Sequence, residues 1–207
     1  MFRIFGKRVE GLEEARKPGA KAKKLSFWAG RVLHYIQDLS VPAHVMPAFH
    51  GPGEPYDGFD AGGVKAKIDA HLGTIDAKWC DRVSRIGASE TRVNRARAIL
   101  NSNAAATMKH KEEAGEVWAH LWLESDETSP AGKKCEHGRL AGGRAKRFRL
   151  TNFGCYSDCE FAPDAECETC PGVTREQMRE LYARQYAQGL EHSVALLMYA
   201  EDYVRAD

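Results

Sequence analysis

An all-α fold is predicted for this chain from the spacing of its apolar residues and from the scarcity of strand patterns. Between residues 25 and 124, and again from residue 173, apolar side chains recur every three or four positions, which is the period of an amphipathic helix. The alternation of apolar and polar residues that is typical of half-buried strands is nearly absent. With 207 residues, 43% of them hydrophobic, the chain is long enough for one domain with an inserted module.

The charge of the chain is balanced overall and uneven locally. The net charge is +1, so composition alone gives no field that would attract nucleic acid or an anionic membrane. Residues 1–24 carry eight basic and three acidic side chains, and residues 133–149 carry seven basic side chains against Glu136. We interpret both stretches as solvated surface. No apolar run is long enough to span a bilayer.

The first elements are a basic arm and a helix. We interpret residues 1–24 as a basic N-terminal arm, either poorly ordered or forming a short helix, because Pro18 and Gly19 interrupt it. These residues lack the apolar stretch of a signal peptide, so we expect a cytoplasmic protein or an exported one that is truncated upstream. The helical core, 25–124, begins with a helix that Pro42 ends. Its apolar stripe comprises Leu25, Trp28, Val32, Ile36 and Leu39.

Further helices are predicted on both sides of a cysteine-containing segment. Residues 45–63 are rich in proline and glycine and predict a loop, after which 64–86 read as one long helix. A helix capped by Ser89 extends to about Leu100, and another reaches about Glu124. Residues 125–172 predict a loop-rich insertion. Finally, 173–207 hold a C-terminal helix that packs on the core, begins at a capping box of Thr174 and Gln177, and ends near Tyr203.

A metal-binding motif is predicted where the first core helix ends. His34 and Asp38 are four residues apart and therefore share one helix face, away from the apolar stripe. Gly30 leaves room one turn earlier, which suits a helix that presents ligands into a pocket. His44 follows Pro42 on the exit turn. Imidazole and carboxylate are good zinc ligands, although an isolated His–Asp pair is more often a surface ion pair.

The whole segment GRVLHYIQDLSVPAH resembles the central motif of the zinc-dependent phospholipase C family, which includes the fungal single-strand zinc nucleases. The resemblance implies an all-α helical bundle and metal-assisted phosphodiester hydrolysis by one to three zinc ions. It implies that His34 and Asp38 bind one zinc, that Asp38 bridges to a second and so takes part in catalysis, and that His44 begins another ligand set. The matching positions are Gly30, Leu33, His34, Tyr35, Asp38, Pro42 and His44.

The chain departs from this family on both sides of the motif. Residues 1–33 contain no histidine and no aspartate, so the resemblance implies a reduced site or a chain truncated ahead of the motif. Downstream, the family adds a histidine and a carboxylate four residues later. We favour His50, with Glu54 or Asp60 as the carboxylate, because this loop is near His44. The alternatives pair Tyr56 with Asp60, or His120 with Glu124; His71 and His192 are interpreted as core or boundary histidines.

The insertion holds a second candidate site. Five of the six cysteines lie in residues 135–170, and the last four have the spacing C-x3-C-x7-C-x2-C. Four thiolates at this spacing predict a structural zinc site, whereas an oxidised set would form two disulfides. Both alternatives stay open. The sixth, Cys80, is expected to be a buried free thiol. The four cysteines are Cys155, Cys159, Cys167 and Cys170.

These features lead to one preferred function and two alternatives. The preferred one is a zinc-dependent phosphodiester hydrolase that acts on phospholipid or nucleic acid. The first alternative is a non-catalytic relative that keeps a partial metal site and uses the cysteine module to bind a partner. The second is nucleic-acid binding through the cysteine module and Lys133–Arg149, with Phe148 and Phe153 as its aromatic support.

Overall fold

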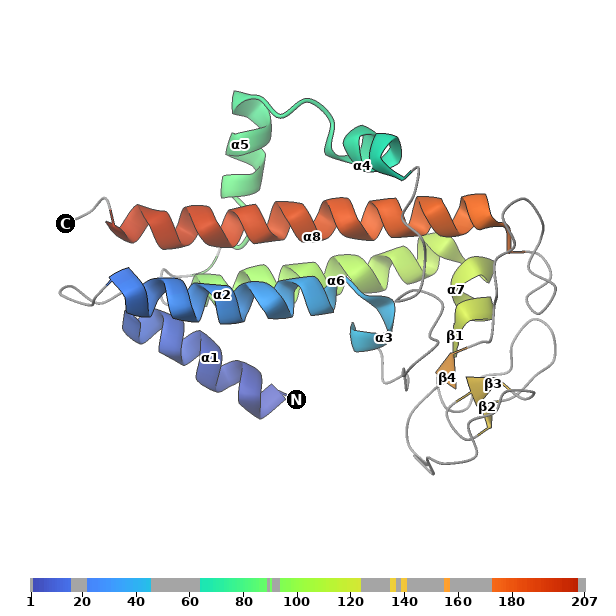
Figure 1. Cartoon of the computed structure of the whole chain (residues 1–207), viewed down its shortest axis with the longest axis horizontal. Coiled ribbons are helices and arrows are strands. Elements are labelled where there is room, and N and C mark those ends of the chain that lie inside the picture. Colours follow the sequence, from blue (N-terminus) through green and yellow to red (C-terminus); the bar gives the residue numbers. More distant parts are fainter. Residues whose placement is uncertain are drawn as a thin grey trace. The chain divides into compact units, whose positions relative to one another are not determined.

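The protein is all-α, as the sequence predicts, in the computed structural model (Figure 1). Two compact units divide the chain: the first comprises Met1–Ser40, Leu72–Ala106 and Tyr186–Asp207, and the second Val41–His71 and Thr107–Gln185. The structure describes residues 2–15, 22–45, 64–88, 90, 94–123, 135–136, 139–140, 155–156 and 173–204. The helices are α1 (Phe2–Ala15), α2 (Ala22–Leu39), α3 (Pro42–Val45), α4 (Lys65–Leu72), α5 (Ala77–Ser84), α6 (Arg95–Ala114), α7 (Glu116–Leu121) and α8 (Arg175–Val204).

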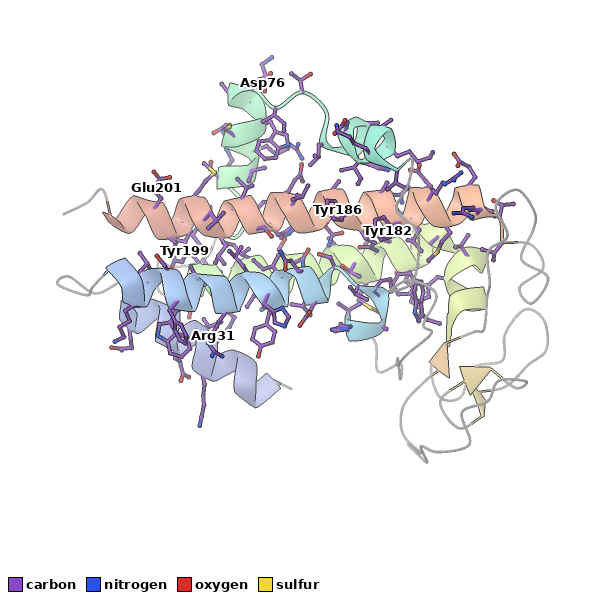
Figure 2. The ribbon with its side chains drawn as sticks, viewed as in Figure 1. Arg31, Asp76, Tyr182, Tyr186, Tyr199 and Glu201 are labelled. Atoms are coloured by element: carbon purple, nitrogen blue, oxygen red, sulfur yellow. The ribbon has the colours of Figure 1, made fainter. Side chains whose placement is uncertain are left out.

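The core of the first unit is formed by α1, α2, α5 and the parts of α6 and α8 that belong to it. Val32 and Ile36 of α2 are fully buried, as the apolar stripe predicts, and Tyr199 of α8 lies between α8 and α2 (Figure 2). The guanidinium of Arg95 stacks over the Tyr199 ring at 5.5 Å from its centroid. The other buried members are Val9, Leu12, Ala29, Tyr35, Trp79, Val83, Ala96, Ile99, Leu100, Ala195 and Leu196.

The N-terminal segment forms a helix, which is the second of the two structures expected for it. Val9, Leu12 and Ala15 of α1 are buried, and the first two belong to the core of the first unit. Gly11 allows α1 to approach α2 closely, because a Cβ atom at this position would lie 2.7 Å from the Trp28 ring. The helix that carries these basic side chains therefore also has an apolar face that packs in the core of the first unit.

The long helix predicted over residues 64–86 is wrong, because two short helices occupy this stretch. Gly73 ends α4 in the left-handed conformation, at φ +67°, which favours glycine. Asp76 then caps α5, since its side chain accepts a hydrogen bond of 2.9 Å from the backbone N–H of Trp79. The apolar stripe is broken accordingly: Ile75 is 64% exposed, whereas Trp79 and Val83 are buried.

The predicted break near Leu100 is also wrong. Helix α6 continues without interruption from Arg95 to Ala114 and ends where Gly115 takes a positive φ of 47°. Leu100 and Asn103 of this helix are both buried. Packing on both sides of the predicted break therefore favours one continuous helix. Ser89, the predicted cap, lies outside the described residues.

The second unit has its own apolar core, in which Trp118 and Trp122 pack with ring centroids 5.1 Å apart. Helix α8 begins as predicted: the Thr174 hydroxyl accepts from the Gln177 N–H at 3.1 Å, and the Gln177 side-chain oxygen accepts from the Thr174 N–H at 2.7 Å. The core is completed by Ala43, Val117, Val173, Met178 and Leu181.

A small sheet accompanies this core, and part of it lies in the segment predicted to be a loop-rich insertion. Its strands are paired in the order β1-β4-β3-β2, with the β3–β4 pair parallel and the other two pairs antiparallel. Each strand has two residues, so the sheet does not alter the fold class. The strands are β1 (Trp122–Leu123), β2 (Cys135–Glu136), β3 (Arg139–Leu140) and β4 (Cys155–Tyr156).

Candidate functional site

His34 and Asp38 lie on one face of α2, as their spacing predicts. His34 Nε2 is 3.5 Å from Asp38 Oδ2. The His34 side chain is 65% exposed and that of Asp38 is 27% exposed, so solvent reaches both. Val32 and Ile36 are buried on the other side of the helix. The pair is therefore accessible to a ligand, and its spacing is set by a single helical turn.

Among the described residues, no segment covers this face of α2, and the pocket that the sequence predicts here stays a prediction. A Cβ atom at Gly30 would meet nothing within 4 Å. Phe27 is 53% exposed, and the guanidinium carbon of Arg31 lies 4.6 Å from its ring centroid. Amphipathicity fixes which residues of a helix face away from its core, but not whether another segment covers them. A cation and an aromatic ring thus precede the His–Asp pair on the same helix.

A buried polar network anchors the turn of α2 that carries the pair. The carbonyl oxygen of Ile36 accepts hydrogen bonds from Ser40 Oγ, at 3.0 Å, and from Asn103 Nδ2, at 2.6 Å. Gln188 Nε2 in turn donates to the backbone oxygen of Asn103, at 2.8 Å, and to its side-chain oxygen, at 2.7 Å. These hydrogen bonds connect α8 to Asn103 of α6 and Asn103 to α2, and they hold the last turn of α2 in place.

His44, the third predicted ligand, lies on α3 in the second unit. Pro42 and Ala43 of this four-residue helix are buried, while His44 is partly exposed. His50, Glu54 and Asp60 lie outside the described residues, as does the alternative Tyr56, and the side chain of His120 is not described either. Among the described residues, no three histidine, cysteine, aspartate or glutamate side chains gather closely enough to hold a metal ion.

A second cluster of charged side chains joins α4 and α8 within the second unit. His71 Nε2 is 2.7 Å from Glu180 Oε1, and Lys67 Nζ contacts Glu180 Oε2 at 3.2 Å and Glu176 Oε1 at 2.8 Å. The lysine lowers the pKa of Glu176, and the hydrogen bonds from Lys67 and His71 outweigh burial to lower that of Glu180. His71 is therefore an exposed residue of an ion-pair cluster, and the expectation of a core or boundary histidine is wrong.

His110 on α6 belongs to the same region and was missed by sequence reasoning. Burial is the main cause that lowers its pKa, with the charge of Arg184 acting in the same direction, so it is neutral at pH 7. Its Nδ1 is buried without a hydrogen-bond partner among the described residues. Arg184 pairs with Glu113 one turn of α6 further along, at 2.6 Å. No local sequence signal marks His110, because Arg184 comes from a distant part of the chain.

The two cysteine predictions have different outcomes. Cys135 and Cys155 begin β2 and β4, and Cys159, Cys167 and Cys170 lie outside the described residues. The choice between zinc and disulfides therefore stays a prediction. Cys80 was expected to be buried, but it is an exposed free thiol, because the α5 residues that enter the core are Trp79 and Val83.

Comparison of the chain with protein-family models, with curated proteins and with solved structures gives no match. The resemblance to the zinc-dependent phospholipases and nucleases therefore stays confined to the motif of α2 and α3. In the part of the chain that the structure describes, no helix is both long enough and apolar enough to cross a membrane.

Proposed function

We propose that this protein is a zinc-dependent phosphodiester hydrolase whose metal ligands include His34 and Asp38. The observation that carries the proposal is the His34–Asp38 pair, which is solvent-accessible and has its two donor atoms 3.5 Å apart on an anchored helical turn. Imidazole and carboxylate oxygen together are typical of catalytic zinc sites, which keep open coordination positions. The family resemblance implies that His44, six residues after Asp38 in the sequence, begins another ligand set.

In the proposed hydrolysis, the metal ion and the side chains of the protein have different roles. A bound zinc ion would supply a nucleophile at neutral pH and would neutralise charge on phosphate oxygens. His34 and Asp38 would hold this ion, and the family resemblance implies that Asp38 would also serve a second one. Arg31, three residues before His34 on the same helix, adds a cation that attracts a phosphodiester anion. Phospholipid and nucleic acid both carry this group, and one to three ions fit the proposal.

Zinc content after extensive dialysis tests the metal site. We expect at least one tightly held zinc in the wild type that is lost in His34→Ala and in Asp38→Ala. Gln37→Ala, an exposed position on the same helix, is the matched control and should retain it. A Cys159→Ser/Cys170→Ser variant separates any zinc bound by the cysteines. If that variant loses the only zinc present, the histidine site is empty and the proposal fails.

A non-catalytic relative is the second candidate, in which a partial metal site stabilises the fold and the cysteine module binds a partner. It is favoured by the lack of histidine and aspartate in residues 1–33, where the family places further ligands. Hydrolysis of bis(p-nitrophenyl) phosphate separates the candidates. Turnover that a chelator abolishes and added zinc restores supports the hydrolase. Zinc binding without any turnover supports the non-catalytic relative.

A further inference from the structure

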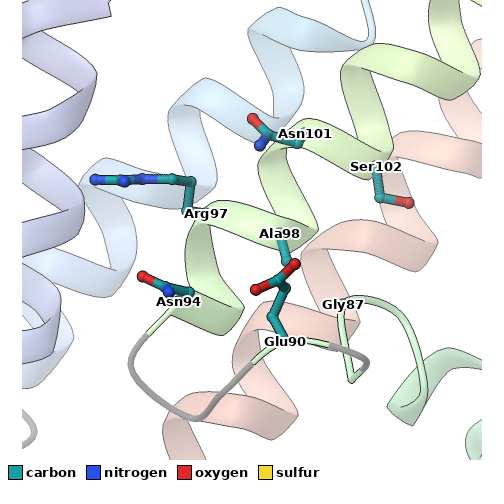
Figure 3. Close-up of a pocket in the computed structure, with 7 residues that line it drawn as sticks. All are labelled: Gly87, Glu90, Asn94, Arg97, Ala98, Asn101 and Ser102. Carbon is teal, nitrogen blue, oxygen red and sulfur yellow. The ribbon is translucent and has the colours of Figure 1, made fainter.

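A hollow lies beside the first two turns of α6, and Ser102 lines it (Figure 3). Its volume is about 420 Å³, and Ser102 is exposed to it. The lining is mostly polar, with one cation, one carboxylate and two amides besides the serine hydroxyl. These are Arg97, Glu90, Asn94 and Asn101. The dimensions and the polar lining suit a small polar molecule.

His192 of α8 lies next to the Ser102 hydroxyl, within the same unit. Its Nε2 is 3.2 Å from Ser102 Oγ, and its Nδ1 is 2.9 Å from the backbone oxygen of Gln188. A carbonyl oxygen only accepts hydrogen bonds, so Nδ1 carries the ring proton and Nε2 is left to accept the proton of Ser102. The orientation and the tautomer of the ring are therefore both fixed by α8 itself.

The environment of His192 keeps this ring available as a base. The residue is only 6% exposed, and burial lowers the pKa of the imidazole although the Gln188 carbonyl and the charge of Glu191 oppose that shift. Arg82 pairs with Glu191 at 2.8 Å, which offsets that carboxylate. At pH 7 His192 is neutral and its Nε2 lone pair points to a hydroxyl. Three groups are thus joined by hydrogen bonds: the Ser102 hydroxyl as nucleophile, His192 as base, and the Gln188 carbonyl that orients the base.

We propose that Ser102 is an activated nucleophile, that His192 is its general base, and that the hollow beside α6 takes short, polar carboxylic esters. The proposal is independent of the zinc site, because none of its residues belongs to the α2 motif. A polar lining disfavours a long acyl chain, and the N–H groups of Arg97 and Asn101 favour an ester that carries hydrogen-bond acceptors.

The reaction is an ordinary acyl transfer. Ser102 Oγ forms a bond to the carbonyl carbon while its proton passes to His192 Nε2, and the carbonyl π electrons move to oxygen. The tetrahedral intermediate then collapses, the bond to the leaving alcohol breaks, and His192 returns the proton to that alcohol. Water attacks the acyl-serine in the same manner with His192 again as the base. The sum is ester and water giving acid and alcohol.

Covalent labelling of the full chain with a fluorophosphonate probe tests the nucleophile. We expect the label on the peptide that contains Ser102 and a burst of p-nitrophenol from p-nitrophenyl acetate, with both lost in Ser102→Ala. Ser84→Ala is the matched control, because the Ser84 hydroxyl donates to the backbone oxygen of Asp81 and not to an imidazole. Absence of label from Ser102 in the wild type overturns the proposal.

The role of His192 as base can be tested without substituting it, which matters because His192→Gln removes a buried side chain and can prevent folding. In Ser102→Cys, the thiol introduced at position 102 should ionise next to His192 and react with iodoacetamide at pH 7 about tenfold faster than Cys80, which is exposed in the same unit. Peptide-resolved mass spectrometry gives both rates from one sample. Equal rates, or a faster rate at Cys80, show that His192 does not activate position 102 and overturn the proposal.

Discussion

Gly189 is the residue at which α8 comes closest to the end of α2. A Cβ atom at this position would lie 2.6 Å from Ser40 Oγ and 3.2 Å from Ser40 Cβ. Both residues are buried, and Ser40 is short, so it cannot swing away from an added methyl group. The glycine therefore allows a close helix approach that any larger residue would prevent.

Substituting this glycine tests the close approach. Gly189→Ala should lower the free energy of unfolding by roughly 1–3 kcal/mol, because overpacking outweighs the gain in helix propensity. Gly30→Ala is the matched control in a helix interior, since a Cβ there meets nothing within 4 Å. It should raise stability by about 0.5–1 kcal/mol. Urea unfolding followed by circular dichroism measures both; a stabilising Gly189→Ala would contradict the close packing.

Helix α8 shows what an intact local signal contributes at the scale of an element. Its start is set by the reciprocal hydrogen bonds of Thr174 and Gln177, and the helix then runs for 30 residues. Thr174→Ala should cost about 1 kcal/mol of stability, because the Gln177 N–H loses its acceptor. Thr174→Ser keeps the hydroxyl and should cost less than half as much. Thermal unfolding of both variants provides the measurement, and equal losses would show that the hydroxyl is not the cap.

A second cap explains why two helices replace the single one expected over residues 64–86. Asp76→Ala should destabilise α5 by about 1 kcal/mol, because it removes the acceptor of the Trp79 N–H. Asp76→Asn preserves an acceptor oxygen and should remain close to wild type. Hydrogen exchange of the α5 amides would resolve the effect to this helix. Unchanged exchange in Asp76→Ala would mean that packing of Trp79 and Val83 alone holds α5.

The elements that the sequence predicts correctly are those whose signals are local. The capping box, the apolar stripe of α2 and the His34–Asp38 spacing all lie within one or two helical turns. The break at Gly73 and Asp76 was missed because apolar periodicity continues across it, although glycine and an N-cap residue were both present. The partners of His71 and His192 were not predictable, since Glu180 and Ser102 are 109 and 90 residues away in sequence.

For the whole molecule, the buried His192 and the half-buried His110 predict how the free energy of unfolding depends on pH. Burial is the main cause that lowers the pKa of His192 in the first unit and of His110 in the second, from an ordinary value of 6.5. The folded protein therefore disfavours the protonated rings, and unfolding takes up protons at mildly acidic pH. The free energy of unfolding should be at its highest above about pH 6.5. It should fall as the pH decreases from there towards the pKa values of the two histidines in the folded protein.

Urea midpoints measured at pH 7.5 and 5.5 test this dependence. The wild type should lose stability over this interval, and a His110→Gln/His192→Gln variant should lose less. Gln37→Ala is the control, because this exposed side chain carries no titratable group and its loss should leave the dependence unchanged. A wild-type midpoint that rises on acidification would show that these two rings do not dominate.

The hydrogen bonds among Ser40, Asn103 and Gln188 have a consequence for the axial register of α2, α6 and α8. Apolar contacts are non-directional, so a helix that slides by one turn, about 5.4 Å, can still bury leucine against leucine. The same slide would separate these amides from their acceptors, at a cost of about 1–3 kcal/mol for each buried group. The double substitution Asn103→Leu/Gln188→Leu should therefore preserve the helical content. In an NMR spectrum of this variant, single backbone amide resonances should split into several. The three polar side chains select one alignment among those that the apolar core would accept.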